Sequence, residues 1–171
     1  RICLVGSEMC IRDRPGIAPV HIKGIKKAGP KTLRLDRVWV TDSRAERLIL
    51  VDTSAADPAA EMTVARSGFV DNEADTLIFG YALKHLAVDG SVAIGAKTDS
   101  LLWCGWRESE ASLTDSLLSL SGAQPWLRRD TNPPDPSATF AAPTVTGATI
   151  KAGVTAPRPL PDHPDQLRAQ L

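Results

Sequence analysis

The stretch that most constrains the fold is residues 71–97, which holds the densest apolar run of the chain and its clearest start and stop signals. Asp71 or Asn72 can cap a first helical turn, and acidic residues follow where the helix dipole is positive. Apolar side chains then recur at helical spacing until Gly90, which can adopt the left-handed conformation that ends helices. The stretch therefore predicts a helix that is followed at once by a buried strand at 91–94.

Two further helices are expected on either side of this stretch. Residues 108–122 begin with Ser109 as a cap, carry leucines on one side and stop at a glycine. Asp57 before a proline opens a shorter helix over 59–66. Together with 71–97, the sequence thus predicts two main helices and one short one.

Strands are expected where β-branched and apolar residues alternate or run together. Residues 20–25 suit a short edge strand, 32–41 a longer strand, and 47–52 a central strand that is apolar on both faces. The short link between the last two predicts an antiparallel hairpin. Residues 100–106 and 144–150 are further strand candidates.

Charge and length limit the classes of function. The 171 residues carry 20 basic and 20 acidic side chains and a formal net charge of zero. Nucleic acids and acidic membranes attract clustered positive charge, so neither is an expected partner. No run approaches 18 apolar residues, which predicts no membrane span, and the low cysteine count favours a reducing, cytoplasmic location.

The first fourteen residues have an unusual pattern. Gly6-Ser-Glu-Met-Cys-Ile-Arg-Asp-Arg14 closely resembles the peptide obtained when a short-read sequencing adapter is translated at the end of an assembled contig. The resemblance implies that 1–14 is not native, that the natural N-terminus is missing and that the fold begins near Pro15. Cys104 is then the remaining thiol, and the three histidines are scattered, so no metal site is expected.

These expectations combine into a mixed α/β fold. Residues 15–122 would form an N-terminally truncated domain with a single sheet of about four or five strands, covered by the two main helices. Nine of the thirteen prolines lie beyond residue 122, and apolar periodicity nearly vanishes there. Residues 123–171 are therefore expected to be an extended or disordered tail.

One pattern suggests an enzyme. Leu48-Ile-Leu-Val-Asp52 is an apolar run that ends in an acid, and 75–79, 82–86 and 90–94 follow it. These fragments resemble the second strand, and then the fourth strand, following helix and fifth strand, of class I S-adenosylmethionine-dependent methyltransferases. The resemblance implies that Asp52 binds the ribose hydroxyls of S-adenosylmethionine as a cofactor. The glycine-rich loop of that family is missing before Asp52.

Two other features concern binding. Arg158, Leu160, Pro161 and Pro164 have the spacing of a polyproline motif read by SH3 domains, with a stiff linker as the alternative. Trp103, Trp106 and Trp126 could form an aromatic platform or simply complete the core, and Cys104 between the first two is expected to be a core residue.

Two functions follow from the sequence. The first is a non-catalytic binding or structural-assembly module, with no cofactor and with the proline-rich tail as connector. The alternative is a fragment of a methyltransferase-like enzyme that uses Asp52. Parallel neighbouring strands at 47–52, 75–79 and 91–95 with a cleft at their C-terminal ends would favour the enzyme. An antiparallel hairpin of 32–41 with 47–52, with no cleft beside Asp52, would oppose it.

Overall fold

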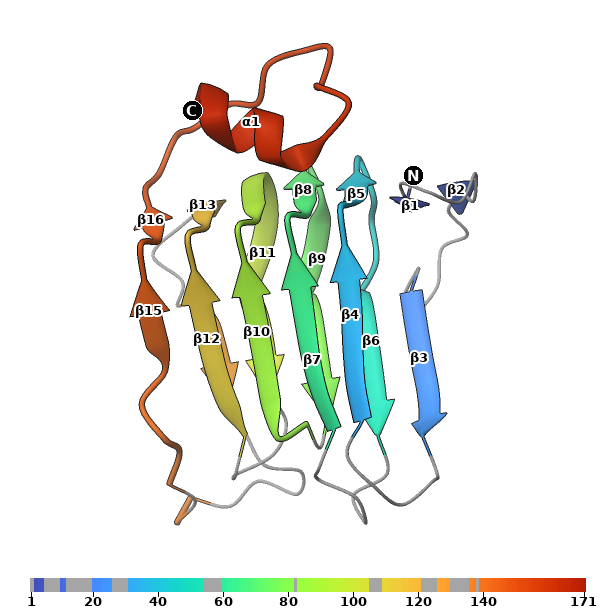
Figure 1. The fold of residues 1–171 in the computed structure, drawn as a ribbon, viewed down its shortest axis with the longest axis vertical. Coiled ribbons are helices and arrows are strands. Elements are labelled where there is room, and N and C mark those ends of the chain that lie inside the picture. Colours follow the sequence, from blue (N-terminus) through green and yellow to red (C-terminus); the bar gives the residue numbers. More distant parts are fainter. Residues whose placement is uncertain are drawn as a thin grey trace.

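The chain is a parallel β-solenoid in which short strands stack into three sheets around one interior (Figure 1). The computed structural model describes residues 2–4, 10–11, 20–25, 31–53, 60–81, 83–104, 109–120, 126–129, 136–137 and 139–171. Five coils are described, and each passes through the sheets in the order B, C, A. Strands pair with the strands of the next coil, so the backbone groups are hydrogen-bonded between coils.

The three sheets are named by their strands. Sheet A holds β5 (Val38–Thr41), β8 (Gly68–Val70), the first part of β11 (Val92–Cys104), β13 (Leu117–Leu120) and β16 (Thr149–Ile150). Two further strands extend it: β1 (Ile2–Leu4) pairs antiparallel with β5, and β2 (Cys10–Ile11) pairs antiparallel with β1. Sheet B holds β3 (Val20–Ile25), β6 (Arg47–Thr53), β9 (Glu73–Tyr81), the second part of β11 and β14 (Leu127–Arg129). Sheet C holds β4 (Lys31–Asp36), β7 (Ala60–Ala65), β10 (His85–Asp89), β12 (Glu110–Thr114) and β15 (Thr144–Thr146).

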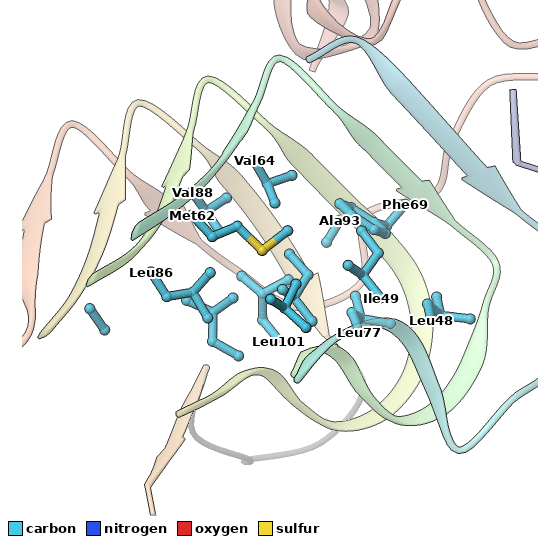
Figure 2. Close-up of a cluster of buried hydrophobic side chains, with 14 of the residues drawn as sticks. Leu48, Ile49, Met62, Val64, Phe69, Leu77, Leu86, Val88, Ala93 and Leu101 are labelled. Carbon is cyan, nitrogen blue, oxygen red and sulfur yellow. The ribbon is translucent and has the colours of Figure 1, made fainter. Parts of the chain in front are cut away.

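The interior is formed by every second residue of each strand. On sheet C the residues at one interior level are Leu35, Val64, Val88, Leu113 and Val145, which are register partners from coil to coil. Side chains from sheets A and B meet them in the same core (Figure 2). Because a strand alternates its side chains between two faces, the stacked coils bury a continuous apolar column.

Sheets C and A meet at a tight corner that repeats in each coil. Its first residue has positive φ in every coil: Arg37, Arg66, Gly90, Asp115 and Gly147. In three coils a buried serine follows, namely Ser67, Ser91 and Ser116. The amide of Ser67 donates to Oγ of Ser91 (3.0 Å), and the amide of Ser91 donates to Oγ of Ser116 (3.1 Å). The serine row therefore satisfies buried backbone donors between coils.

The C-terminal segment 154–167 folds back over the outer face of sheet A. That face is apolar and consists of Trp39, Val70, Val92, Ile94 and Leu117. From the C-terminal segment, Val154, Ala156, Leu160 and Leu167 pack against it. Indole Nε1 of Trp39 donates to the carbonyl of Asp162 (3.1 Å). The helix α1 (Pro164–Gln170) ends this segment and lies at the top of Figure 1.

Arg158 fixes the segment to the corner between sheets A and B. Its guanidinium donates to carboxylates of Asp42 (3.2 Å) and Asp71, two corner residues of positive φ. These bonds raise the pKa of Arg158, chiefly through the Asp71 carboxylate. Residues 144–171, expected to be extended or disordered, thus contribute two strands, one helix and part of an apolar cluster.

The expected mixed α/β fold is wrong, because both main helices are strands. Residues 71–97 contain β9, β10 and the start of β11, and 108–122 contain β12 and β13. In β9 the exposed Glu73 and Asp75 alternate with the buried Ala74 and Thr76, a period of two. Hydrogen bonds to neighbouring coils outweigh the local helical spacing. Gly90 is left-handed as expected, but it joins two strands.

The short helix and the hairpin are wrong as well. Residues 60–65 form β7, and 32–41 is divided at Arg37 into β4 and β5, which lie in different sheets. β6 instead lies between β3 and β9, in parallel with both. The strands predicted at 20–25 and 47–52 are confirmed as β3 and β6. In the part of the chain that the structure describes, no helix is long and apolar enough to cross a membrane.

Candidate binding face on sheet C

The outer face of sheet C is open, in contrast to that of sheet A. In β7, β10 and β12 the inward side chains are buried, and the outward ones are mostly half-buried or exposed. Figure 1 views this face from the front, and no described segment crosses it. Five parallel strands therefore present their outward side chains to solvent, apart from Ala65, which is buried.

The outward side chains form three straight rows, because the strands pair without a shift of register. The first row is Thr32, Glu61, His85 and Glu110. The middle row is Arg34, Thr63, Ala87, Ser112 and Thr144. The third row is Asp36, Ala65, Asp89, Thr114 and Thr146. Neighbouring members of a row are about 4.8 Å apart, the spacing of paired strands.

One hydrogen bond links the first two rows. Nε2 of His85 lies 3.0 Å from Oγ of Ser112. Nζ of Lys84 lies 3.9 Å from Oε1 of Glu61, although both side chains are about half exposed, so this ion pair contributes little to stability. Apart from Arg34 at one end, the middle row consists of small side chains, and carboxylates lie in the rows on both sides of it.

The third row begins with an ion pair. Nε of Arg66 donates to Oδ1 of Asp36 (2.8 Å), and its Nη2 donates to the other carboxylate oxygen. The Arg66 hydrogen bond holds the pKa of Asp36 below its usual value, and partial burial opposes this shift. Asp36 is therefore ionised at neutral pH, and a ligand on this margin would meet a negatively charged carboxylate.

Of the described residues that the sequence analysis considered, His85, one of the three histidines, lies on this face. Asp52 pairs through its backbone with Lys23 of β3 and Tyr81 of β9 in sheet B, and its side chain lies outside the described residues. The methyltransferase pattern needs a helix at 82–86, where β10 begins. β9 and β11 are parallel neighbours through 97–104 and not through 91–95.

Cys104 is buried and has no disulfide partner. Burial raises the pKa of its thiol to about 11, which keeps the thiol protonated at neutral pH. Trp126 is half-buried against the core, while the side chain of Trp103 and all of Trp106 lie outside the described residues. Among the described residues, no three histidine, cysteine, aspartate or glutamate side chains cluster as a metal site would require.

The polyproline motif lies within the folded C-terminal segment. Arg158 binds two carboxylates, Leu160 packs against the sheet A cluster, and Pro164 is buried at the start of α1. Docking of an SH3 domain stays a prediction, and it would require this segment to leave sheet A.

Sequence reasoning did not find the rows of sheet C, although their signal is present. The stretches 61–65, 85–89, 110–114 and 144–146 alternate polar and apolar residues, except that Ala65 and Ala87 stand at outward positions. A left-handed or glycine residue follows each of them. The alternation extends over only three to five residues at a time, too few to outweigh a competing helical pattern.

The fold and this face define the chain as a parallel β-solenoid with one covered and one open outer sheet. No protein-family model matches the chain, and neither a curated protein nor a solved structure shows significant similarity to it.

Proposed function

We propose that the chain is a non-catalytic binding module whose binding surface is the outer face of sheet C. The observation that supports this most directly is the set of three straight polar rows on a face that no described segment covers. The inner side of the same strands is the solenoid core, so the outward groups are held on a rigid support. Such a surface can bind a ligand with little loss of its own conformational entropy.

The ligand class that fits these groups is an extended, hydroxyl-rich polymer, namely a polysaccharide. Threonine and serine hydroxyls both donate and accept hydrogen bonds, as sugar hydroxyls do, and the marginal carboxylates accept them. A linear polymer along the solenoid axis would meet hydroxyl groups of the middle row in three of the five coils, at Thr63, Ser112 and Thr144. The zero net charge of the chain provides no general attraction to a charged polymer, which favours a neutral one.

Calorimetric titration with soluble neutral, acidic and basic polysaccharides tests this proposal. The variants Thr63→Lys and Ser112→Lys place a long charged side chain in the middle row, and the control Gln170→Lys makes the same change on the exposed side of α1. We expect binding of a neutral polysaccharide that weakens at least about tenfold in both sheet C variants, equal to roughly 1.4 kcal/mol, and is unchanged in the control.

Two results would contradict the proposal. One is the absence of binding to all three polymer classes at millimolar concentrations. The other is binding that Thr63→Lys and Ser112→Lys leave unchanged, because the ligand would then occupy another surface.

A further inference from the structure

The last coil of the solenoid exposes side chains that belong to the interior. Val145 of β15 is 48% exposed and Ile150 of β16 is 54% exposed. Their register partners one coil earlier, Leu113 and Leu118, are 0% and 1% exposed. Val145 and Ile150 therefore occupy core positions that no further coil covers among the described residues.

The chain itself does not cover this end with its described C-terminal residues. After Ile150 it turns away, and the amide of Val154 already donates to Oγ of Ser119 (3.0 Å) at sheet A. Residues 154–167 then follow the outer face of sheet A. Among the described strands, β15 pairs with β12 alone, so one edge of sheet C ends here.

The sequence of this edge lacks the usual protection against pairing. Edge strands generally carry charges, prolines or bulges that prevent association. Residues 144–150, Thr-Val-Thr-Gly-Ala-Thr-Ile, contain no charge and no proline. A free strand edge with exposed apolar side chains is suited to the addition of another strand.

We propose that this end binds the same end of a second copy of the chain, through antiparallel pairing of β15 with the β15 of that copy. A two-fold axis at Val145 would place the two Val145 side chains opposite each other and each Thr144 opposite a Thr146. Valine pairs would extend the core, and threonine pairs are favourable across strands. No like charges would meet, and two-fold dimers are the commonest symmetric assembly.

A head-to-tail stack fits less well. It would require β16 to take the edge of β5 in the next copy, and β1 already pairs with that edge. Pairing of the two β15 strands instead joins the two C sheets edge to edge, so the polar rows would continue from one copy into the other. The inference does not depend on the proposed polysaccharide binding.

Sedimentation velocity over a range of protein concentrations tests the dimer. We expect the wild-type chain to shift from one to two copies as concentration rises, with a weak affinity because the end of a solenoid buries a small area. Val145→Lys should weaken dimerisation at least about tenfold, since two like charges would meet at the axis. Ile150→Lys should weaken it as well, because it places a charge among the exposed apolar side chains of this end. Both side chains are exposed, so the folded chain should tolerate these changes.

The matched control is Thr63→Lys, which changes a β-branched residue of sheet C away from this edge. It should leave dimerisation intact while it weakens polysaccharide binding, so the two proposals fail separately. A wild-type chain that stays monomeric to millimolar concentration, or a dimer that Val145→Lys does not weaken, would overturn the inference.

Oxidative cross-linking fixes the arrangement. In a background with Cys3→Ser, Cys10→Ser and Cys104→Ala, the single variant Val145→Cys should form a disulfide-linked dimer. If Val145→Cys links to a Leu35→Cys chain and not to itself, the copies stack head to tail and the proposed symmetry is wrong.

Discussion

Sheets A and C are built by the same coils, yet their outer faces differ in chemistry and in cover. The outer face of sheet A presents residues such as Trp39, Val92 and Leu117 and is packed against the C-terminal segment. The corresponding positions of sheet C carry hydroxyl and carboxylate groups and remain open. The inward residues of both sheets are apolar. The interior therefore requires the same alternation everywhere, and the outward residues alone decide whether a sheet is covered or left free to bind.

The largest difference is expected between apolar truncations on the covered face and polar truncations on the open face. Leu167 is fully buried between α1 and sheet A, so Leu167→Ala should lower the free energy of unfolding by about 2–5 kcal/mol. Thr63→Ala on sheet C should change it by less than about 0.5 kcal/mol. Urea denaturation measures both values. If Leu167→Ala cost as little as Thr63→Ala, the C-terminal segment would add no stability.

The second prediction concerns how closely the covered face is packed. A Cβ atom at Gly68 would lie 2.2 Å from Cζ3 of Trp39, and Gly68→Ala should therefore cost about 1–3 kcal/mol. The cost should fall in a Trp39→Leu background, where the ring is absent. A double-mutant cycle by urea denaturation measures this coupling, and additive effects would show that the ring is not the cause.

The third prediction concerns the charged margin of the open face. Because the pKa of Asp36 is lowered in the folded chain, its ion pair with Arg66 stabilises the fold above the unfolded pKa of the carboxyl. This contribution is lost as pH falls through the folded pKa. Asp36→Asn should thus lower stability by less than about 1 kcal/mol at pH 7, and the difference from wild type should shrink toward pH 3. A difference that grows with acidity would contradict the assignment.

The smallest effect is expected at Arg158, which fixes the C-terminal segment from an exposed position. Its side chain is 48% exposed, so Arg158→Gln should cost between about 0 and 1 kcal/mol. Since salt screens exposed charges, the cost should decrease between low and high ionic strength. Thermal unfolding at two salt concentrations checks this, and a cost independent of salt would indicate packing and not charge.

Local sequence identified single strands but not the architecture. The apolar run at 47–52 and the alternation at 20–25 are strong enough to mark β6 and β3. The apolar residues of 71–97 and 108–122 include Leu77, Ile78, Leu117 and Leu118, and these four are all buried. What the sequence could not show is their partners, because parallel coils join residues that are far apart along the chain.

The repeat itself is hidden by unequal coil lengths. The interior partners Leu35, Val64, Val88, Leu113 and Val145 are separated by 29, 24, 25 and 32 residues. A search for a fixed period cannot find such a series. The rows of the candidate face depend on this register, so they became visible only once the coils were aligned in space.

The connections between the sheets differ in how well they can accept inserted residues. Between sheets C and A one or two residues connect the strands in every coil, whereas between sheets B and C the connection ranges from 3 to 14 residues. An added residue beside Ser91 would misplace both the hydroxyl that accepts from the Ser67 amide of the preceding coil and the amide that donates to Ser116 of the following coil. The B-to-C side is therefore where a guest loop, an affinity tag or a fluorescent label should be inserted, since it can lengthen without disturbing the stacked coils.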